Sequence, residues 1–146
     1  MQYHKQKFLH NPDQGTFGDC HRTVIACLLD KEPEEVPHWG IHYFDTDMFS
    51  KVCNDYLASQ GLMEVRVPFQ CELDVVLNHQ KCVNPGVYYM LTGKSRTGTN
   101  HVVVCLDDKI IHDPSLTNSG IIAPCIEDDH YWIGYLVSTK FLYKEA

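Results

Sequence analysis

The sequence has no run of apolar residues long enough to cross a membrane, since a spanning helix needs about 18 or more. Its first seven residues are too polar to form the apolar core of a secretory signal. Basic residues are few, because 12 Lys and Arg stand against 19 Asp and Glu and the formal net charge is −7. Nucleic acids and anionic membranes attract a positive surface that such a chain lacks. We therefore expect neither a nucleic-acid partner nor a membrane partner.

Paired cysteines are also missing. The chain has seven cysteines, an odd number, and none forms a C-x-x-C pair. Without an export signal, this pattern indicates free thiols in a reducing compartment, most of them packed as small apolar residues. We expect a cytoplasmic protein.

The length of 146 residues and the apolar fraction of 44% are typical of one globular domain spanning 1–146. Apolar spacing predicts helices over 20–29, 47–60 and 72–79, the second of them capped by Asp45 or Thr46 and stopped by Gly61. Strands are predicted over 63–67, 87–91, 101–106, 110–112 and 131–137. Helices followed by antiparallel strands indicate an α+β fold.

The first chemically informative stretch is Gln14-Gly15-Thr16-Phe17-Gly18-Asp19-Cys20, which leads into the first predicted helix. A thiol on the first turn of a helix feels the positive end of the helix dipole, which favours the nucleophilic thiolate. Asp19 is a candidate N-cap, and Gly18 allows close approach of a substrate to the backbone. The Gln14 amide is a candidate donor to an oxyanion. Cys27, further along the same helix, is expected to be a packing residue.

The second informative stretch begins with His101, which opens an apolar strand, and ends at Asp113-Pro114 on the predicted return strand. A carboxylate on a neighbouring strand can orient an imidazole base. A three-residue turn over 107–109 would place His101 and Asp113 on one face of the hairpin as a diagonal pair.

A two-residue turn over 107–108 would swap the faces. His101 would then share a face with Cys105 and His112, which is a metal-ligating set rather than a catalytic one. The turn contains no glycine that would decide its type, so both registers stay open.

Taken together, these stretches resemble the papain-like cysteine peptidases, and most closely the double-glycine peptidases that trim bacteriocin leaders and their small bacterial and phage-encoded relatives. The shared pattern is Gln14-x₅-Cys20, then His101-Val-Val-Val, then Asp113-Pro. The resemblance implies a papain-like fold, with a helix carrying the cysteine packed on an antiparallel sheet carrying His and Asp. It further implies that Cys20 attacks, His101 is the base, Asp113 orients it and Gln14 builds the oxyanion hole. His21 stands where the leader peptidases usually have glycine.

The resemblance implies a peptide or protein substrate and no metal or other cofactor. We expect Gly18 and Asp19 beside the cysteine to contact the substrate. In the polar loop before the histidine, Lys94, Arg96 and Asn100 are the candidate substrate-binding residues, because the two cations suit an acidic substrate. A phage-encoded protein of this kind would act in the cytoplasm of its host.

Two other functions remain as alternatives. One is a catalytically idle papain-like module that binds or inhibits a partner, such as a viral protein directed at a host factor. The other is a zinc protein built on His38-x₃-His42 or His101-x₃-Cys105. Neither spacing has a C-x₂-C partner, and Pro37 and Gly40 oppose a helix at the first pair. The aromatic residues over 37–44 either line a cleft or, as we favour, cap a small core.

Overall fold

The computed structural model describes residues 1–142. Its three α-helices are α1 (Cys20–Leu28), α2 (Thr46–Ser59) and α3 (Leu73–Val83). Its five strands are β1 (Leu62–Phe69), β2 (Tyr88–Lys94), β3 (Asn100–Leu106), β4 (Lys109–His112) and β5 (Tyr131–Ser138). Short 3₁₀ turns occur at Pro12–Gln14, Pro33–Glu35, Trp39–His42 and Thr139–Phe141.

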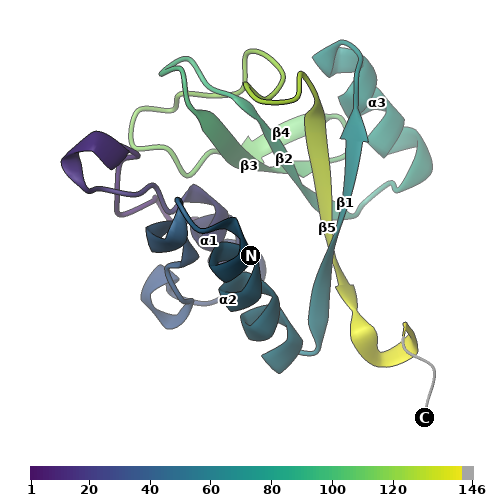
Figure 1. Cartoon of the computed structure of the whole chain (residues 1–146). Helices are drawn as coiled ribbons and strands as arrows, with labels where there is room; N and C mark the ends of the chain where they lie inside the picture. The colour runs from purple at the N-terminus through teal and green to yellow at the C-terminus, as the bar shows by residue number, and fades with distance from the viewer. Residues whose placement is uncertain (143–146) are drawn as a thin grey trace.

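The strands form one antiparallel sheet in the order β1-β5-β2-β3-β4. Helices α1 and α2 lie on one face of this sheet and α3 on the other, as Figure 1 shows. The structure thus confirms a mixed fold with an antiparallel sheet. None of the helices in residues 1–142 is long and apolar enough to cross a membrane.

Two apolar cores follow from the alternation of side chains along β3. Val102 and Val104 pack toward α1 and α2, whereas Val103 and Cys105 pack toward α3. Because residues on both faces of β3 are apolar, the strand forms a continuous apolar run in the sequence. Cys27 is fully buried on the α1 side, as expected of a packing residue.

The predicted helix signals are confirmed at α2. The Asp45 carboxylate accepts a hydrogen bond from the Met48 N–H at 3.0 Å, and Gly61, with φ of 70°, follows the last turn. Helix α3 runs four residues beyond its predicted end at His79, because no residue that breaks a helix occurs before Pro85.

The hairpin of β3 and β4 contains both of the registers considered above. A two-residue turn over 107–108 begins it, and a β-bulge follows on β4. The pairing therefore runs Leu106 with Lys109, Cys105 with Ile110, and then Val104 with His112. Because the bulge adds one residue at Ile111, every later residue of the strand changes face.

The bulge decides which side chains meet. Asp113 moves to the face of His101, as the three-residue turn predicted, although the turn itself has two residues. His112 moves to the opposite face, where its Nε2–H donates to the His4 carbonyl at 2.7 Å. The alternative cluster of His101, Cys105 and His112 is therefore not formed.

Candidate active site

Cys20 is the first residue of α1 and is partly exposed. The first hydrogen bond of the helix runs from the Thr23 N–H to the Asp19 carbonyl at 3.0 Å. The N–H groups of the preceding turn therefore have no partner within the helix, and together they carry the positive end of its dipole. This end of α1 favours negative charge on the Cys20 sulfur and on an oxygen bound beside it.

His101 is the second residue of β3, and its Nε2–H donates to the Asp113 carboxylate at 2.6 Å. The same carboxylate accepts the backbone N–H groups of Ser115 and Gly120, each at 2.8 Å. Because Asp113 is held by three donors, it fixes the plane of the imidazole and leaves Nδ1 for Cys20.

The ionisation of this pair is strongly coupled. Burial by itself lowers the pKa of His101, but hydrogen bonds with Asp113 and Cys20 outweigh it and raise this pKa to about 9. Burial by itself raises the pKa of Asp113, but the bonds from His101, Ser115 and Gly120 outweigh it and lower this pKa to about 2. The geometry thus favours an imidazolium between a carboxylate and the Cys20 sulfur.

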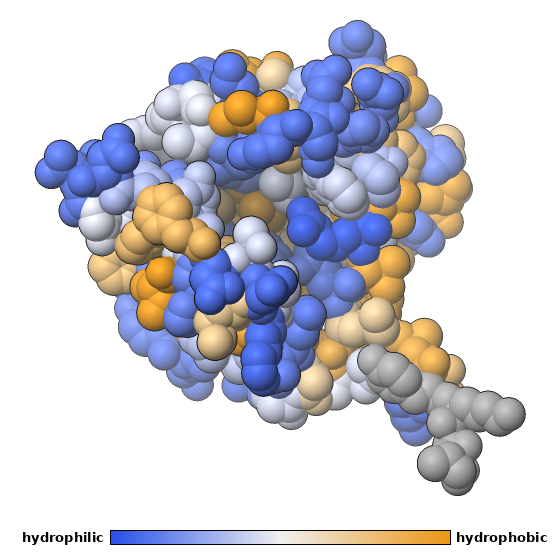
Figure 2. Space-filling view, in the orientation of Figure 1, coloured by the Kyte–Doolittle hydropathy of each residue, from blue (hydrophilic) through white to orange (hydrophobic). Residues whose placement is uncertain are grey.

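Cys20 and His101 lie where two arms of a cleft meet, and they line both of them. One arm, of about 290 Å³, is lined by aromatic and apolar side chains and is called the aromatic arm here. The other, of about 270 Å³, is lined by hydroxyl and amide side chains and is called the hydroxyl arm. In the orientation of Figure 1, the surface is hollowed between the helices and the sheet (Figure 2).

Three of the residues predicted to bind substrate lie at this cleft. Gly18 lines both arms, and a Cβ there would come within 2.9 Å of the His10 Cβ. Asn100 also lines both, but its amide is used within the protein, bonding to Glu127 and to the Ile126 N–H. Asn100 therefore stabilises the wall of the cleft.

Asp19 lines the aromatic arm with its backbone, since its carboxylate is fully buried. That carboxylate caps no N–H of α1. It accepts the N–H groups of Lys7 and Phe8 and pairs with the buried Arg22 guanidinium at 3.0 Å. Asp19, which the sequence predicted to contact the substrate, thus belongs to a buried ion pair and holds residues 7 and 8 next to Cys20.

The other two predicted substrate-binding residues, Lys94 and Arg96, and the predicted oxyanion donor Gln14 do not line either arm of the cleft. Arg96 bonds to the carbonyls of Asn118 and Ser119 and so holds the loop after Asp113. Lys94 pairs with Ala123 through its backbone. Gln14 is exposed in the 3₁₀ turn Pro12–Gln14 and lines neither arm.

Sequence reasoning missed Gln6. This residue is 7% exposed and lines the hydroxyl arm together with Cys20 and His101. Its backbone N–H donates to the Pro114 carbonyl at 2.8 Å, and its amide donates to the Phe8 carbonyl at 2.6 Å. No local pattern marks Gln6, because the Pro114 carbonyl and the cleft residues around it come from segments far away in the sequence.

The aromatic segment over 37–44 serves both functions considered for it. Trp39 is 1% exposed and belongs to the core beneath the cleft, whereas Tyr43 lies at the cleft wall with nearly half of its surface exposed.

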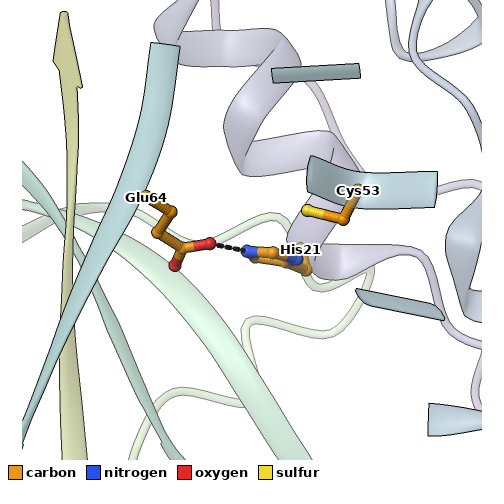
Figure 3. Close-up of side chains that lie close together, drawn as sticks. All are labelled: His21, Cys53 and Glu64. Atoms are coloured by element: carbon orange, nitrogen blue, oxygen red, sulfur yellow. Dashed lines mark hydrogen bonds and ion pairs between the residues drawn. The ribbon is translucent and has the colours of Figure 1, made fainter. Parts of the chain in front are cut away.

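One group in residues 1–142 has the spacing of a metal site. It consists of His21 from α1, Cys53 from α2 and Glu64 from β1, whose ligand atoms lie within 4.8 Å of one another (Figure 3). The His21 Nε2–H donates to Glu64 at 3.0 Å. Burial raises the pKa of the Cys53 thiol to about 12, so this sulfur stays protonated.

The tautomer of His21 opposes metal binding at this group. The Trp39 indole donates to His21 Nδ1 at 3.1 Å, and an indole N–H can only donate. If a metal bound Nε2 of His21, the imidazole proton would have to lie on Nδ1. That proton would then point at the indole hydrogen of Trp39. The three residues therefore fit a hydrogen-bonded core contact and not a metal centre.

The coupled His101–Asp113 pair predicts a pH-dependent stability. Because folding raises the pKa of His101 from 6.5 to about 9, its contribution is complete below pH 6.5 and is lost as the pH rises through 9. Because folding lowers the pKa of Asp113 from 3.8 to about 2, its contribution is complete above pH 3.8 and is lost as the pH falls through 2. The contribution of His101 to the free energy of unfolding should fall by on the order of 2–3 kcal/mol across the alkaline window.

Urea denaturation from pH 6 to pH 9.5 measures this fall, with His101→Gln as the comparison. The variant should be less stable than the native chain at pH 6 and should lose much less on the way to pH 9.5. Parallel pH profiles for the two proteins would contradict the coupling.

Searches of protein-family models, of curated proteins and of solved structures find no match to this chain, so its function rests on the site itself.

Proposed function

We propose that this protein is a cysteine hydrolase of the papain-like type, which cleaves an amide bond of a peptide or protein through an acyl-enzyme. The observation that carries the proposal is that Cys20 and His101 line one cleft, while the Asp113 carboxylate bonds to the His101 imidazole at 2.6 Å. The same three residues, in the same order along the chain, carry the sequence resemblance to that superfamily together with Gln14.

In the first half of the reaction, the Cys20 thiolate attacks the carbonyl carbon and a C–S bond forms. The carbonyl electrons move to oxygen, which becomes an oxyanion. His101, protonated and held by Asp113, then gives its proton to the leaving nitrogen as the C–N bond breaks. The amine departs and the acyl group remains on Cys20 as a thioester.

The oxyanion needs two donors beside Cys20. The Cys20 backbone N–H is one of them, since it lies at the start of α1. Gln6 supplies the second in our proposal, in the role that the sequence pattern suggested for Gln14. One N–H of the Gln6 amide bonds to the Phe8 carbonyl, which leaves its second N–H for the cleft.

In the second half, His101 takes a proton from water, and the hydroxide formed attacks the thioester carbonyl. The C–S bond breaks, the acid product leaves, and the thiolate–imidazolium pair returns. Asp113 holds the ring throughout and keeps its charge.

The direct test is hydrolysis of a proteome-derived peptide pool, read by mass spectrometry. The native chain should generate new termini, and Cys20→Ala should generate none above background, because the acyl-enzyme cannot form. Cys82→Ala, which changes an exposed cysteine on α3, is the matched control and should retain full activity. Cleavage that persists in Cys20→Ala would contradict the proposal.

The assignment of Gln6 is tested by comparing Gln6→Ala with Gln14→Ala. Loss of an oxyanion donor lowers kcat by about 10²–10³-fold, so Gln6→Ala should show this loss and Gln14→Ala should not. Alkylation of Cys20 by iodoacetamide forms no oxyanion, and its rate should therefore be unchanged in Gln6→Ala. Equal losses of hydrolysis and alkylation would instead mean that Gln6 only supports the fold.

A further inference from the structure

Residues 5–8 bond to both halves of the candidate active site, and this segment is called the strap here. At one end, its backbone donates hydrogen bonds of 3.0 and 2.9 Å to the Asp19 carboxylate, next to Cys20. At the other end, its backbone donates a hydrogen bond of 2.8 Å to the Pro114 carbonyl, next to Asp113. The strap therefore joins the helix start that carries the nucleophile to the loop that orients the base.

That loop, residues 113–120, is called the Asp113 loop here, and its backbone groups have two sets of partners. Four of its N–H groups bond within the loop, two to the Asp113 carboxylate at 2.8 Å and two to the Ser115 hydroxyl at 3.2 Å. Its carbonyl groups accept hydrogen bonds mainly from outside the loop, and two cations, Lys5 and Arg96, supply most of these bonds. The place of the Asp113 carboxylate therefore depends on these outer contacts.

The Lys5 ammonium donates to three oxygens of the Asp113 loop. They are the carbonyls of Asp113 and Ser115, at 2.8 and 2.9 Å, and the side-chain oxygen of Asn118, at 2.8 Å. An ammonium group has three N–H donors, so all of them are used here. Because hydrogen bonds from a charged donor are roughly twice as strong as neutral ones, Lys5 fixes the spacing of three residues in a loop without regular structure.

A second lysine of the strap has no contact of this kind. The Lys7 ammonium pairs with Glu34 at 3.2 Å and so lies outside the Asp113 loop. Both lysines are exposed, and neither lines an arm of the cleft. A difference between substitutions of Lys5 and Lys7 will therefore report the bonds to the Asp113 loop, and not the loss of a positive charge from the strap.

We infer that Lys5 is a positioning residue of the proposed reaction. By fixing the Asp113 loop to the strap, it holds the His101 imidazole where it can exchange a proton with Cys20. The inference rests on the proposed function, because it takes Cys20 and His101 as the reacting pair. Lys5 acts through Asp113, and a displacement of about 1 Å caused by a distant substitution can cost about 10²-fold in rate.

The first test measures the alkylation rate of Cys20 by iodoacetamide as a function of pH, which needs no substrate. In Lys5→Met, the profile should move to higher pH by roughly one unit, so the rate at pH 6 should fall by roughly tenfold, because a displaced imidazolium favours the thiolate less. Lys5→Arg should recover most of the native rate, since a guanidinium also donates several charged hydrogen bonds. Lys7→Met should keep the native profile.

The buried thiols report the fold in the same experiment. They should stay protected in every variant, and they are Cys27, Cys53, Cys105 and Cys125. Cys27 also reports the surroundings of the strap, because its sulfur accepts the His4 N–H at 3.3 Å. Fast labelling of these thiols in Lys5→Met would mean that Lys5 supports the fold as a whole, and would overturn the positioning role.

The second test measures kcat and KM with a peptide that the native chain cleaves. Lys5→Met should lower kcat by roughly tenfold or more and leave KM nearly unchanged, since Lys5 lines neither arm of the cleft. Native values of kcat and a native alkylation profile in this variant would overturn the inference and leave the proposed function intact.

Two further outcomes would also overturn the positioning role: a fall in kcat with an unchanged alkylation profile, and equal effects of Lys5→Met and Lys7→Met. If the native chain shows no cleavage that depends on Cys20, the proposed function fails. The alkylation profiles then still decide whether Lys5 holds the imidazole against the Cys20 sulfur.

Discussion

At pH 6, iodoacetamide is expected to alkylate Cys20 at least about tenfold faster than the exposed Cys71 and Cys82, because iodoacetamide reacts with the thiolate and only Cys20 lies beside the His101 imidazolium. The start of α1 and the His101 imidazolium both favour negative charge on the Cys20 sulfur. His101→Ala removes the counter-ion, and the rate at Cys20 should then fall by one to two orders of magnitude, toward that of the exposed thiols.

The other cysteines serve as internal controls in the same mass-spectrometric experiment. Burial raises the pKa values of four thiols, to about 12 for Cys53 and about 11 for Cys125, and in the same direction for Cys27 and Cys105. These four should label slowly until the protein is unfolded. If Cys20 labels no faster than Cys71 at pH 6, the thiolate–imidazolium pair does not exist and an idle binding module becomes the better interpretation.

The largest loss of stability is expected from Asp19→Ala, at about 3–5 kcal/mol of the free energy of unfolding. This substitution leaves the Arg22 guanidinium, itself 8% exposed, without its counter-ion. It also leaves the Lys7 and Phe8 N–H groups without their acceptor, at a further cost for each unpaired group. Chemical denaturation measures the loss directly.

Asp55→Ala is the matched control, because it breaks the exposed i,i+4 pair with Lys51 on α2 and should change stability very little. Adding Arg22→Met to Asp19→Ala should recover part of the loss, since the unpaired charge is then removed. A loss below about 1 kcal/mol in Asp19→Ala would show that the pair is not needed to fasten residues 7 and 8 to α1.

The sequence could predict the elements because their signals are local. The Asp45 cap, the Gly61 stop and the apolar run of β3 each act within a few residues of themselves, and each appears in the structure as expected. The sequence also allowed the His101–Asp113 pair to be predicted. A histidine that opens an apolar strand and an aspartate that ends the return strand can meet only across a hairpin.

Long-range contacts decided what the local patterns left open. The Asp107-Asp108 turn did not reveal that a bulge at Ile111 would follow it, yet this one extra residue brings Asp113 to His101 and turns His112 away. The spacing of Gln14 from Cys20 fitted a known pattern, but the structure leaves Gln14 exposed on the 3₁₀ turn Pro12–Gln14.

By itself, then, the sequence determined the fold class, the helix start that carries Cys20, and the residue types of the central pair, because these depend on local periodicity and capping. Only the tertiary structure decided that Gln6 and not Gln14 lines the cleft with Cys20, and that Asp19 binds Arg22. The physical reason is that a polar side chain is buried only where distant backbone and charged groups satisfy it, and those partners come from segments far apart in the chain.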